Sequence, residues 1–408
     1  MSDTNNLERQ ERKRELRRNI QPDLDAEGAK ALDARILRRR RYMAIRILGV
    51  ILVALLVFAA YRSILRTRKF TEATVVWENT DVAGGNATYE AFGNYVVKVS
   101  NDGISCIDRS GTVLWNSGYT MSNPAVCIRG DYGAVADIQS ETAVIFDESG
   151  VLGTVNTTLS ILNLTISSHG VLALVLDDSE VNYVTFYDNT GNELDIRIKT
   201  KLSGDGYPLD IALFPKGTGL IASVMYLDQG TMQNQIVFYN FDVGQSESDR
   251  VVGYFACGET VFPQVVYLSD TVACACGDNQ VSLYSLENES QPTLTTSIEV
   301  DSEIRSVLTG EDRLGIICDG EEGGSTLAMY DTSGRQIYTA EIDFEYTHAE
   351  FSGENVLIYN ETECLILGAR GSVRFRGSLE GGIVKLVYTG SDSALLFTST
   401  SMERLRFS

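Results

Sequence analysis

The residues of this sequence best suited to redox or metal chemistry are seven cysteines, all of which lie after residue 100. They are Cys106, Cys127, Cys257, Cys274, Cys276, Cys318 and Cys364. An odd number leaves at least one thiol without a partner in its own chain. Cys274 and Cys276 resemble a redox or metal pair, because residues two apart on a strand share one face. Their surroundings, TVACACG, are apolar, so we interpret both as small buried side chains.

The chain holds only two histidines, His169 and His348, so it offers few candidates for catalysis or metal binding by histidine. A metal or nucleophile site would need both residues brought together across the fold. Carboxylates are abundant, so an acid/base pair for glycoside chemistry stays open as an alternative. Scattered charges on an acidic soluble surface are the simpler interpretation. We therefore assign no catalytic, cofactor-binding or metal-ligating residue, and we expect no cofactor.

Three acidic loops carry the clustered oxygens that Ca²⁺ prefers, at residues 177–180, 203–210 and 319–324. None has the spacing of a known calcium loop, so we interpret them as solvated turns. No Gly-rich phosphate loop follows a strand and opens a helix, which leaves nucleotide binding without support. Five N-x-[ST] triplets begin at Asn86, Asn156, Asn163, Asn288 and Asn360, and they matter only in a host that glycosylates them.

From Thr71 onward, short runs rich in Val, Ile, Leu, Tyr and Thr alternate with Gly, Asp, Asn and Ser. This pattern predicts an all-β region of many short antiparallel strands. One hairpin recurs, with a polar residue before a turn that usually contains glycine. The equivalent residues are Asp108, Asp147, Asp188, Asn240, Ser285, Asp331 and Gly368. Their spacing suits the four-stranded blades of a β-propeller.

The number of blades follows from the two ends of this region. Seven hairpins define seven blades, and three further strands remain after residue 380. Upstream, residues 73–79 (ATVVWEN) form a strand with no blade of its own. If this strand completes the last three, the ring closes on both chain ends and no terminal strand edge stays open. We predict eight blades; the alternative is seven, with one hairpin misread within residues 201–260.

The D-x-[ST]-G turn followed by a strand, as at Asp108 and Asp331, resembles the quinoprotein-like propeller repeats of bacteria. Relatives with such repeats include dehydrogenases that carry pyrroloquinoline quinone and a lipoprotein that assists outer-membrane assembly. Trp115 alone occupies the aromatic position that these dehydrogenases repeat, and their vicinal cysteine pair is absent. The resemblance covers about residues 73–408 and implies the fold but no cofactor.

The most apolar stretch begins at Tyr42 and ends at Tyr61, and its 20 residues match a bilayer core of roughly 30 Å. We predict a transmembrane α-helix that contacts the lipid bilayer. Arg46 is the only charge within it and lies near its start, where its side chain reaches the interface. Twelve basic residues precede the span, which places the N-terminus in the cytoplasm. The alternative is a cleaved signal peptide with its apolar core at residues 47–60, but more than 40 residues would precede that core.

Charge is distributed unevenly along the chain. Residues 1–69 hold 17 basic and 8 acidic residues, whereas residues 70–408 hold 17 basic and 47 acidic residues, a net charge of −30. Such an acidic outer region excludes nucleic acid as a partner. The basic segment 1–41 is too short for a core of its own. We interpret it as a topology determinant, and the alternative is binding to anionic headgroups or to a cytoplasmic partner.

These observations predict four parts: a basic cytoplasmic segment (1–41), a transmembrane helix (42–61), a short linker (62–72) and an extracytoplasmic β-propeller (73–408). The arrangement resembles an uncharacterised family of membrane-anchored bacterial propeller proteins. Our leading hypothesis is a binding scaffold at the cell membrane for an envelope protein, a peptide or a glycan, rather than an enzyme. The alternatives are a carboxylate-based hydrolase or lyase acting on envelope polysaccharide, and a sensor that signals through the basic tail.

Overall fold

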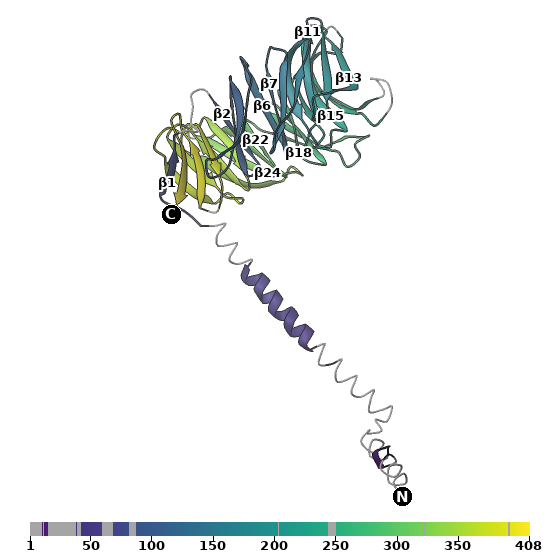
Figure 1. Cartoon of the computed structure of the whole chain (residues 1–408). Coiled ribbons are helices and arrows are strands. Elements are labelled where there is room, and N and C mark those ends of the chain that lie inside the picture. Colours follow the sequence, from purple (N-terminus) through teal and green to yellow (C-terminus); the bar gives the residue numbers. More distant parts are fainter. Residues whose placement is uncertain are drawn as a thin grey trace. The chain divides into compact units, whose positions relative to one another are not determined.

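The computed structural model describes residues 10, 12–14, 38, 42–58, 68–80, 87–202, 204–243, 250–320, 324–390 and 392–408. The chain divides into two compact units, Met1–Arg66 and Thr67–Ser408. In the first unit, residues 42–58 are helical (Figure 1). Within the described part of the chain, no helix is both long enough and apolar enough to cross a membrane. Residues 59–61 of the predicted span lie outside the described residues, so the transmembrane helix stays a prediction.

The described residues of the second unit form eight antiparallel sheets of four strands each, and no other sheet. Blade 1 contains β2 (Thr88–Phe92), β3 (Tyr95–Ser100), β4 (Gly103–Ile107) and β5 (Val113–Gly118). Blade 2 contains β6 (Pro124–Arg129), β7 (Tyr132–Asp137), β8 (Thr142–Asp147) and β9 (Gly150–Asn156). Blade 3 contains β10 (Ser160–Ile166), β11 (Leu172–Asp178), β12 (Val181–Tyr187) and β13 (Glu193–Lys201). Blade 4 contains β14 (Tyr207–Leu213), β15 (Gly219–Asp228), β16 (Thr231–Asn240) and β17 (Val251–Gly258).

The second half of the ring repeats this order. Blade 5 contains β18 (Gln264–Ser269), β19 (Val272–Cys276), β20 (Gln280–Ser285) and β21 (Thr293–Glu299). Blade 6 contains β22 (Ile304–Gly310), β23 (Arg313–Asp319), β24 (Ser325–Asp331) and β25 (Gln336–Ile342). Blade 7 contains β26 (His348–Ser352), β27 (Asn355–Tyr359), β28 (Glu363–Leu367) and β29 (Val373–Ser378). Blade 8 contains β30 (Lys385–Tyr388), β31 (Ser393–Phe397), β32 (Met402–Phe407) and β1 (Ala73–Asn79).

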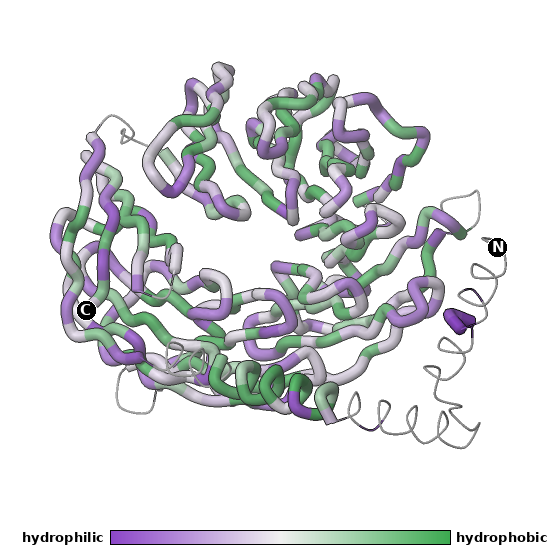
Figure 2. Tube along the Cα trace, turned by 60° about the horizontal axis from the view of Figure 1, so that its bottom comes forward, coloured by the Kyte–Doolittle hydropathy of each residue, from purple (hydrophilic) through white to green (hydrophobic). Residues whose placement is uncertain are grey.

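The core lies between the blades. Eight apolar clusters are each built from two blades that follow one another around the ring, and the eighth joins blade 8 to blade 1. Strands in the middle of a blade are therefore buried on both faces, as in Leu172, Leu174 and Val175 of β11. This explains their continuous apolar sequence, because a half-exposed strand would alternate. Figure 2 shows apolar segments in every part of the ring, with polar segments between them.

The ring closes through the two ends of the second unit. β1 pairs antiparallel with β32, from Ala73 opposite Phe407 to Asn79 opposite Met402. The amide of Thr71 also donates a hydrogen bond to the carbonyl of Ser408, over 2.9 Å. The prediction of an eight-bladed all-β propeller closed by residues 73–79 is thus confirmed, and the alternative of seven blades is wrong.

The recurring D-x-[ST]-G sequence forms the turn between the third and fourth strands. The carboxylate of Asp331 accepts hydrogen bonds from the amide and hydroxyl of Ser333 and from the amide of Arg335. Asp188 is bonded in the same way, and these hydrogen bonds lower the pKa of both carboxyl groups. The aspartate is therefore the residue that shapes the turn.

Each turn of this kind packs on the outer strand of the preceding blade. Trp115 on β5 donates its indole hydrogen bond to the carbonyl of Glu148 in the blade 2 turn, over 3.0 Å. Trp77 on β1 lies against Gly111 of the blade 1 turn, and Tyr338 on β25 lies against Gly371 of the blade 7 turn. The sequence had indicated an aromatic residue in this position at Trp115 alone; the structure adds Trp77 and Tyr338.

Candidate functional site

The cysteine pair singled out by sequence lies in the core. Cys274 and Cys276 are buried in β19, with their sulfur atoms 3.5 Å apart. Burial raises the pKa of the Cys274 thiol well above its usual range, which favours the neutral and less reactive form. Cys318 lies on β23, the equivalent strand of the next blade. All seven cysteines are free, and their setting is that of packed side chains.

The structure does not bring the two histidines together. His169 lies in the turn after β10, the first strand of blade 3, whereas His348 begins β26, the first strand of blade 7. The first strands of all blades run in the same direction along the axis of the ring. The turn after β10 and the start of β26 therefore lie on opposite faces of the ring. The described residues contain no group of three or more His, Cys, Asp or Glu side chains that could hold a metal ion.

The acidic loops also separate into different structures. Residues 177–180 form the tight hairpin between β11 and β12, with Ser179 at a φ of 56°. Residue 203 and residues 321–323 of the other two loops lie outside the described residues. Asp210, predicted as part of a loop, lies instead in β14 and is partly buried.

Asp210 links three consecutive blades through the wall of the ring. Its carboxylate accepts hydrogen bonds from the Asn163 side chain in blade 3 and from the Val265 amide in blade 5, both over 2.8 Å. Burial raises the pKa of this carboxyl group despite the two donors. Both oxygens are engaged, so Asp210 serves as a structural link.

Lys385 makes a similar link on the other side of the ring. Its ammonium group in β30 lies 2.7 Å from Glu350 of blade 7 and 2.9 Å from Glu90 of blade 1. Tyr359 donates a further hydrogen bond to Glu350, over 2.8 Å. These two carboxylates would be candidates for an acid/base pair, but each is paired with the lysine between them. The alternative of a carboxylate-based hydrolase or lyase gains no support here.

Arg129 joins blades that are not neighbours. The side chain leaves the end of β6 in blade 2 and donates a hydrogen bond to the carbonyl of Tyr267 in blade 5, over 2.7 Å. Burial lowers the pKa of this guanidinium group. This hydrogen bond therefore connects blade 2 with blade 5 across the ring.

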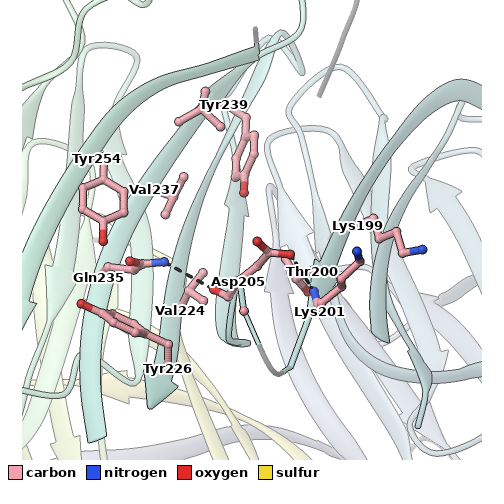
Figure 3. A pocket seen from close by; sticks show the side chains of 12 residues that line it. Lys199, Thr200, Lys201, Asp205, Val224, Tyr226, Gln235, Val237, Tyr239 and Tyr254 are labelled. Carbon is pink, nitrogen blue, oxygen red and sulfur yellow. Dashed lines mark hydrogen bonds between the residues drawn. The ribbon is translucent and has the colours of Figure 1, made fainter. Parts of the chain in front are cut away.

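A cavity of about 860 Å³ lies between blades 3 and 4. We call it the 3/4 cleft. The end of β13 and the following loop form one side, and the sheet of β15, β16 and β17 forms the other (Figure 3). β15 and β16 are the longest described strands, with ten residues each, and they provide a broad face.

The side chains that line the 3/4 cleft are suited to noncovalent binding of a ligand rather than to catalysis. Tyr226 and Tyr254 lie on the blade 4 side, while Lys199 and Lys201 come from β13 (Figure 3). Gln235 donates a hydrogen bond to the backbone carbonyl of Asp205 over 3.5 Å. Partial burial, together with the nearby Tyr226 hydroxyl, raises the pKa of Tyr254.

Two exposed apolar side chains lie at the hairpin between β15 and β16, on the face of the sheet opposite the cleft-lining Tyr226 and Gln235. Leu227 and Met232 face each other across that hairpin, with 65% and 47% of their surfaces exposed. Tyr254 is 57% exposed. Sequence reasoning did not find these residues. The only signal in the sequence was the irregular spacing of the hairpins within residues 201–260. This stretch contains the long strands of blade 4.

Comparison with known proteins supports the fold. No curated protein matches the chain in sequence. Yeast (Saccharomyces cerevisiae) Sqt1 superposes with a TM-score of 0.53 at 10% identity, covering 84% of this chain and 99% of that structure. BamB from Moraxella catarrhalis gives 0.51 at 12% identity, covering 82% and 100%. Sqt1 of Chaetomium thermophilum, bound to the N-terminus of ribosomal protein L10, gives 0.52 at 14% identity, covering 83% and 100%. A family profile described as a family of unknown function matches residues 66–407.

Proposed function

We propose that the propeller of this chain, which belongs to the DUF5711 family of unknown function, is a binding module that holds a segment of another protein. The 3/4 cleft is the observation that carries the proposal. Its volume of about 860 Å³ is within the range of ligand sites, and its walls combine aromatic, amide and ammonium groups. Tyrosine is enriched in protein interfaces because its ring is apolar and its hydroxyl group forms hydrogen bonds.

The rigid ring supports this role. Eight interblade clusters and the links through Asp210 and Lys385 hold neighbouring blades in register. A cleft between two such blades keeps its shape before the partner arrives, which reduces the entropy lost on binding. A propeller of the same architecture, Sqt1, binds the N-terminus of another protein. That example supports a chain segment as the kind of ligand.

The proposal includes the cellular setting. Tyr42 to Tyr61 anchors the chain in the cell membrane as a single helix, with residues 1–41 in the cytoplasm and the propeller outside. The repeats are of the quinoprotein-like kind, with aspartate turns and docking aromatic residues. Support comes from the apolar sequence of the span and from the basic residues that precede it. The ligand is then an envelope protein or a peptide.

A photo-cross-linking amino acid at position 254 of the tagged full-length protein tests the site in its own membranes. A matched cross-linker at position 294 serves as the control, because Leu294 is 48% exposed on the outer strand of blade 5. We expect position 254 to capture one partner with defined stoichiometry, and position 294 to capture none.

The captured partner is then purified and its affinity measured. The Tyr226→Ala/Tyr254→Ala variant should bind it at least about tenfold more weakly, because two aromatic contacts are lost. Leu294→Ala should bind normally. Equal capture at both positions, or full affinity in the double tyrosine variant, would contradict the proposal.

A further inference from the structure

A second, smaller cleft lies between blades 8 and 1, on the side of the ring where the chain ends meet. Its volume is about 430 Å³. Arg404 and Arg406 line it from β32, and Arg109 lines it from the turn of blade 1. Both β32 arginines are exposed, and because they are two residues apart on a strand, they share one face. Trp77 of β1 also lines this cleft.

The positive charge here is unusual for the second unit. Residues 70–408 hold 17 basic and 47 acidic residues, and three of these basic residues line this cleft. Exposed charges farther away than about 10 Å are largely screened at 0.1 M salt. Among the lining residues of the cleft, arginines outnumber carboxylates by three to one, which favours a small anion despite the acidic remainder of the propeller.

Counter-ions within the cleft do not neutralise these arginines. Asp392 is the carboxylate among the lining residues, and its oxygen lies 3.8 Å from the Nε atom of Arg406. Arg109 uses one nitrogen to donate a hydrogen bond to the carbonyl of Thr389, over 3.1 Å. A guanidinium group has five N–H donors, so Arg109 keeps others for a ligand. Three guanidinium groups thus face one carboxylate.

We infer that the cleft between blades 8 and 1 is an anion-binding site that takes a phosphate group through Arg109, Arg404 and Arg406. Guanidinium groups suit this ligand, because they donate paired hydrogen bonds to phosphate oxygens. Trp77 and the hydroxyl of Ser110 complete the walls. The phosphate belongs either to an anionic lipid headgroup or to a soluble molecule. The site is separate from the 3/4 cleft and does not depend on the function proposed for it.

Trp77 provides a fluorescent reporter, because the chain has only two tryptophans. The full chain with Trp115→Phe keeps Trp77 as its single tryptophan. In one arm, inorganic pyrophosphate is titrated into this protein in a neutral detergent. In a second arm, the protein is reconstituted in nanodiscs of phosphatidylcholine alone or with phosphatidylglycerol. We expect Trp77 emission to change in at least one arm and the pyrophosphate response to weaken as salt rises.

The Arg404→Gln/Arg406→Gln variant should weaken the response at least about tenfold, because charge-assisted hydrogen bonds to the anion are lost. The control, Arg197→Gln/Lys216→Gln, removes the same charge from blades 3 and 4 and should respond normally. An arginine-dependent response to pyrophosphate alone identifies a soluble ligand. A response to phosphatidylglycerol alone identifies the headgroup, and a response in both arms identifies the phosphate group itself. No response in either arm, or equal loss in both double variants, would overturn the inference.

Discussion

Lys385 shows how a charged side chain is accommodated in the wall of the ring. Only 11% of the side chain is exposed, which disfavours an ammonium ion. Burial lowers the pKa of this group, but the carboxylates of Glu350 and Glu90 outweigh burial and raise it. Because the three residues belong to blades 7, 8 and 1, their pairing fixes the relative positions of three sheets at the closure of the ring.

Replacing this lysine should therefore destabilise the propeller. Lys385→Met leaves two partly buried carboxylates facing each other, and we expect the free energy of unfolding to fall by about 2 kcal/mol. Adding Glu90→Gln and Glu350→Gln should recover much of the loss, because the repulsion disappears. Chemical denaturation of the wild type, of Lys385→Met and of the triple variant measures these differences in the free energy of unfolding. The exposed pair of Lys216 and Glu289 provides the control, since Lys216→Met should change stability by less than about 0.5 kcal/mol.

The raised pKa of Lys385 also sets the sign of its pH dependence. The ammonium group binds its proton more tightly in the folded state. Its contribution to the free energy of unfolding is therefore complete below the unfolded-state pKa of about 10.4, and it is lost as pH rises through the folded-state pKa. The difference in stability between wild type and Lys385→Met should thus shrink at strongly alkaline pH. A difference that stays constant would contradict the ion-pair account.

At the scale of elements, β1 is the strand on which ring closure depends. It pairs with β32, and Trp77 reaches beyond its own blade to the turn at Gly111. Gly111 has a φ of 83°, and a Cβ atom there would lie 2.2 Å from the Trp77 ring. The glycine is thus needed for two reasons, the left-handed backbone and the close approach of the indole.

Two alanine substitutions separate these reasons. Gly230 has a φ of 88°, close to that of Gly111, but no atom lies within 4 Å of the position of its Cβ atom. We expect Gly230→Ala to cost about 1 kcal/mol from backbone strain alone. Gly111→Ala should cost about 2 kcal/mol more, because Trp77 must move. Hydrogen exchange of β1 and β32 should rise in Gly111→Ala only. Similar costs for both variants would show that the Trp77 contact contributes nothing.

At the scale of the whole molecule, the chain's division into two units predicts how it can be shortened. Removing residues 1–66 leaves every described strand in place, including β1. We expect this protein to be released from membranes into the soluble fraction, with its melting temperature unchanged. Removing residues 1–79 instead deletes β1 and exposes the edge of β32, so we expect a lower melting temperature and aggregation. Fractionation and thermal unfolding measure both results. Retention of the first variant on membranes would contradict the anchor at residues 42–61.

The sequence predicted the repeat but not how the repeats meet. Hairpins such as the one at Asp108 were recognisable, because turn chemistry and strand periodicity are local. The closing role of residues 73–79 followed from counting strands. Contacts such as the one between Arg129 and Tyr267 join residues 138 positions apart, and no local pattern encodes them. The 3/4 cleft was missed for the same reason, since its shape depends on how the long strands of blade 4 stand against β13.

The pairing of β1 with β32 also fixes the order of events during synthesis. Among the described strands, β1 is translated first and its partner β32 last, with Met402 lying 323 residues after Asn79. At about 5 to 20 residues per second, the strand waits roughly 15 to 65 s for that partner. Val75 and Val76, which are 55% and 60% exposed even in the finished ring, belong to this waiting strand. The propeller can therefore be completed only after residues 402–407 have been synthesised, and a ribosome that stalls before residue 402 leaves an open ring.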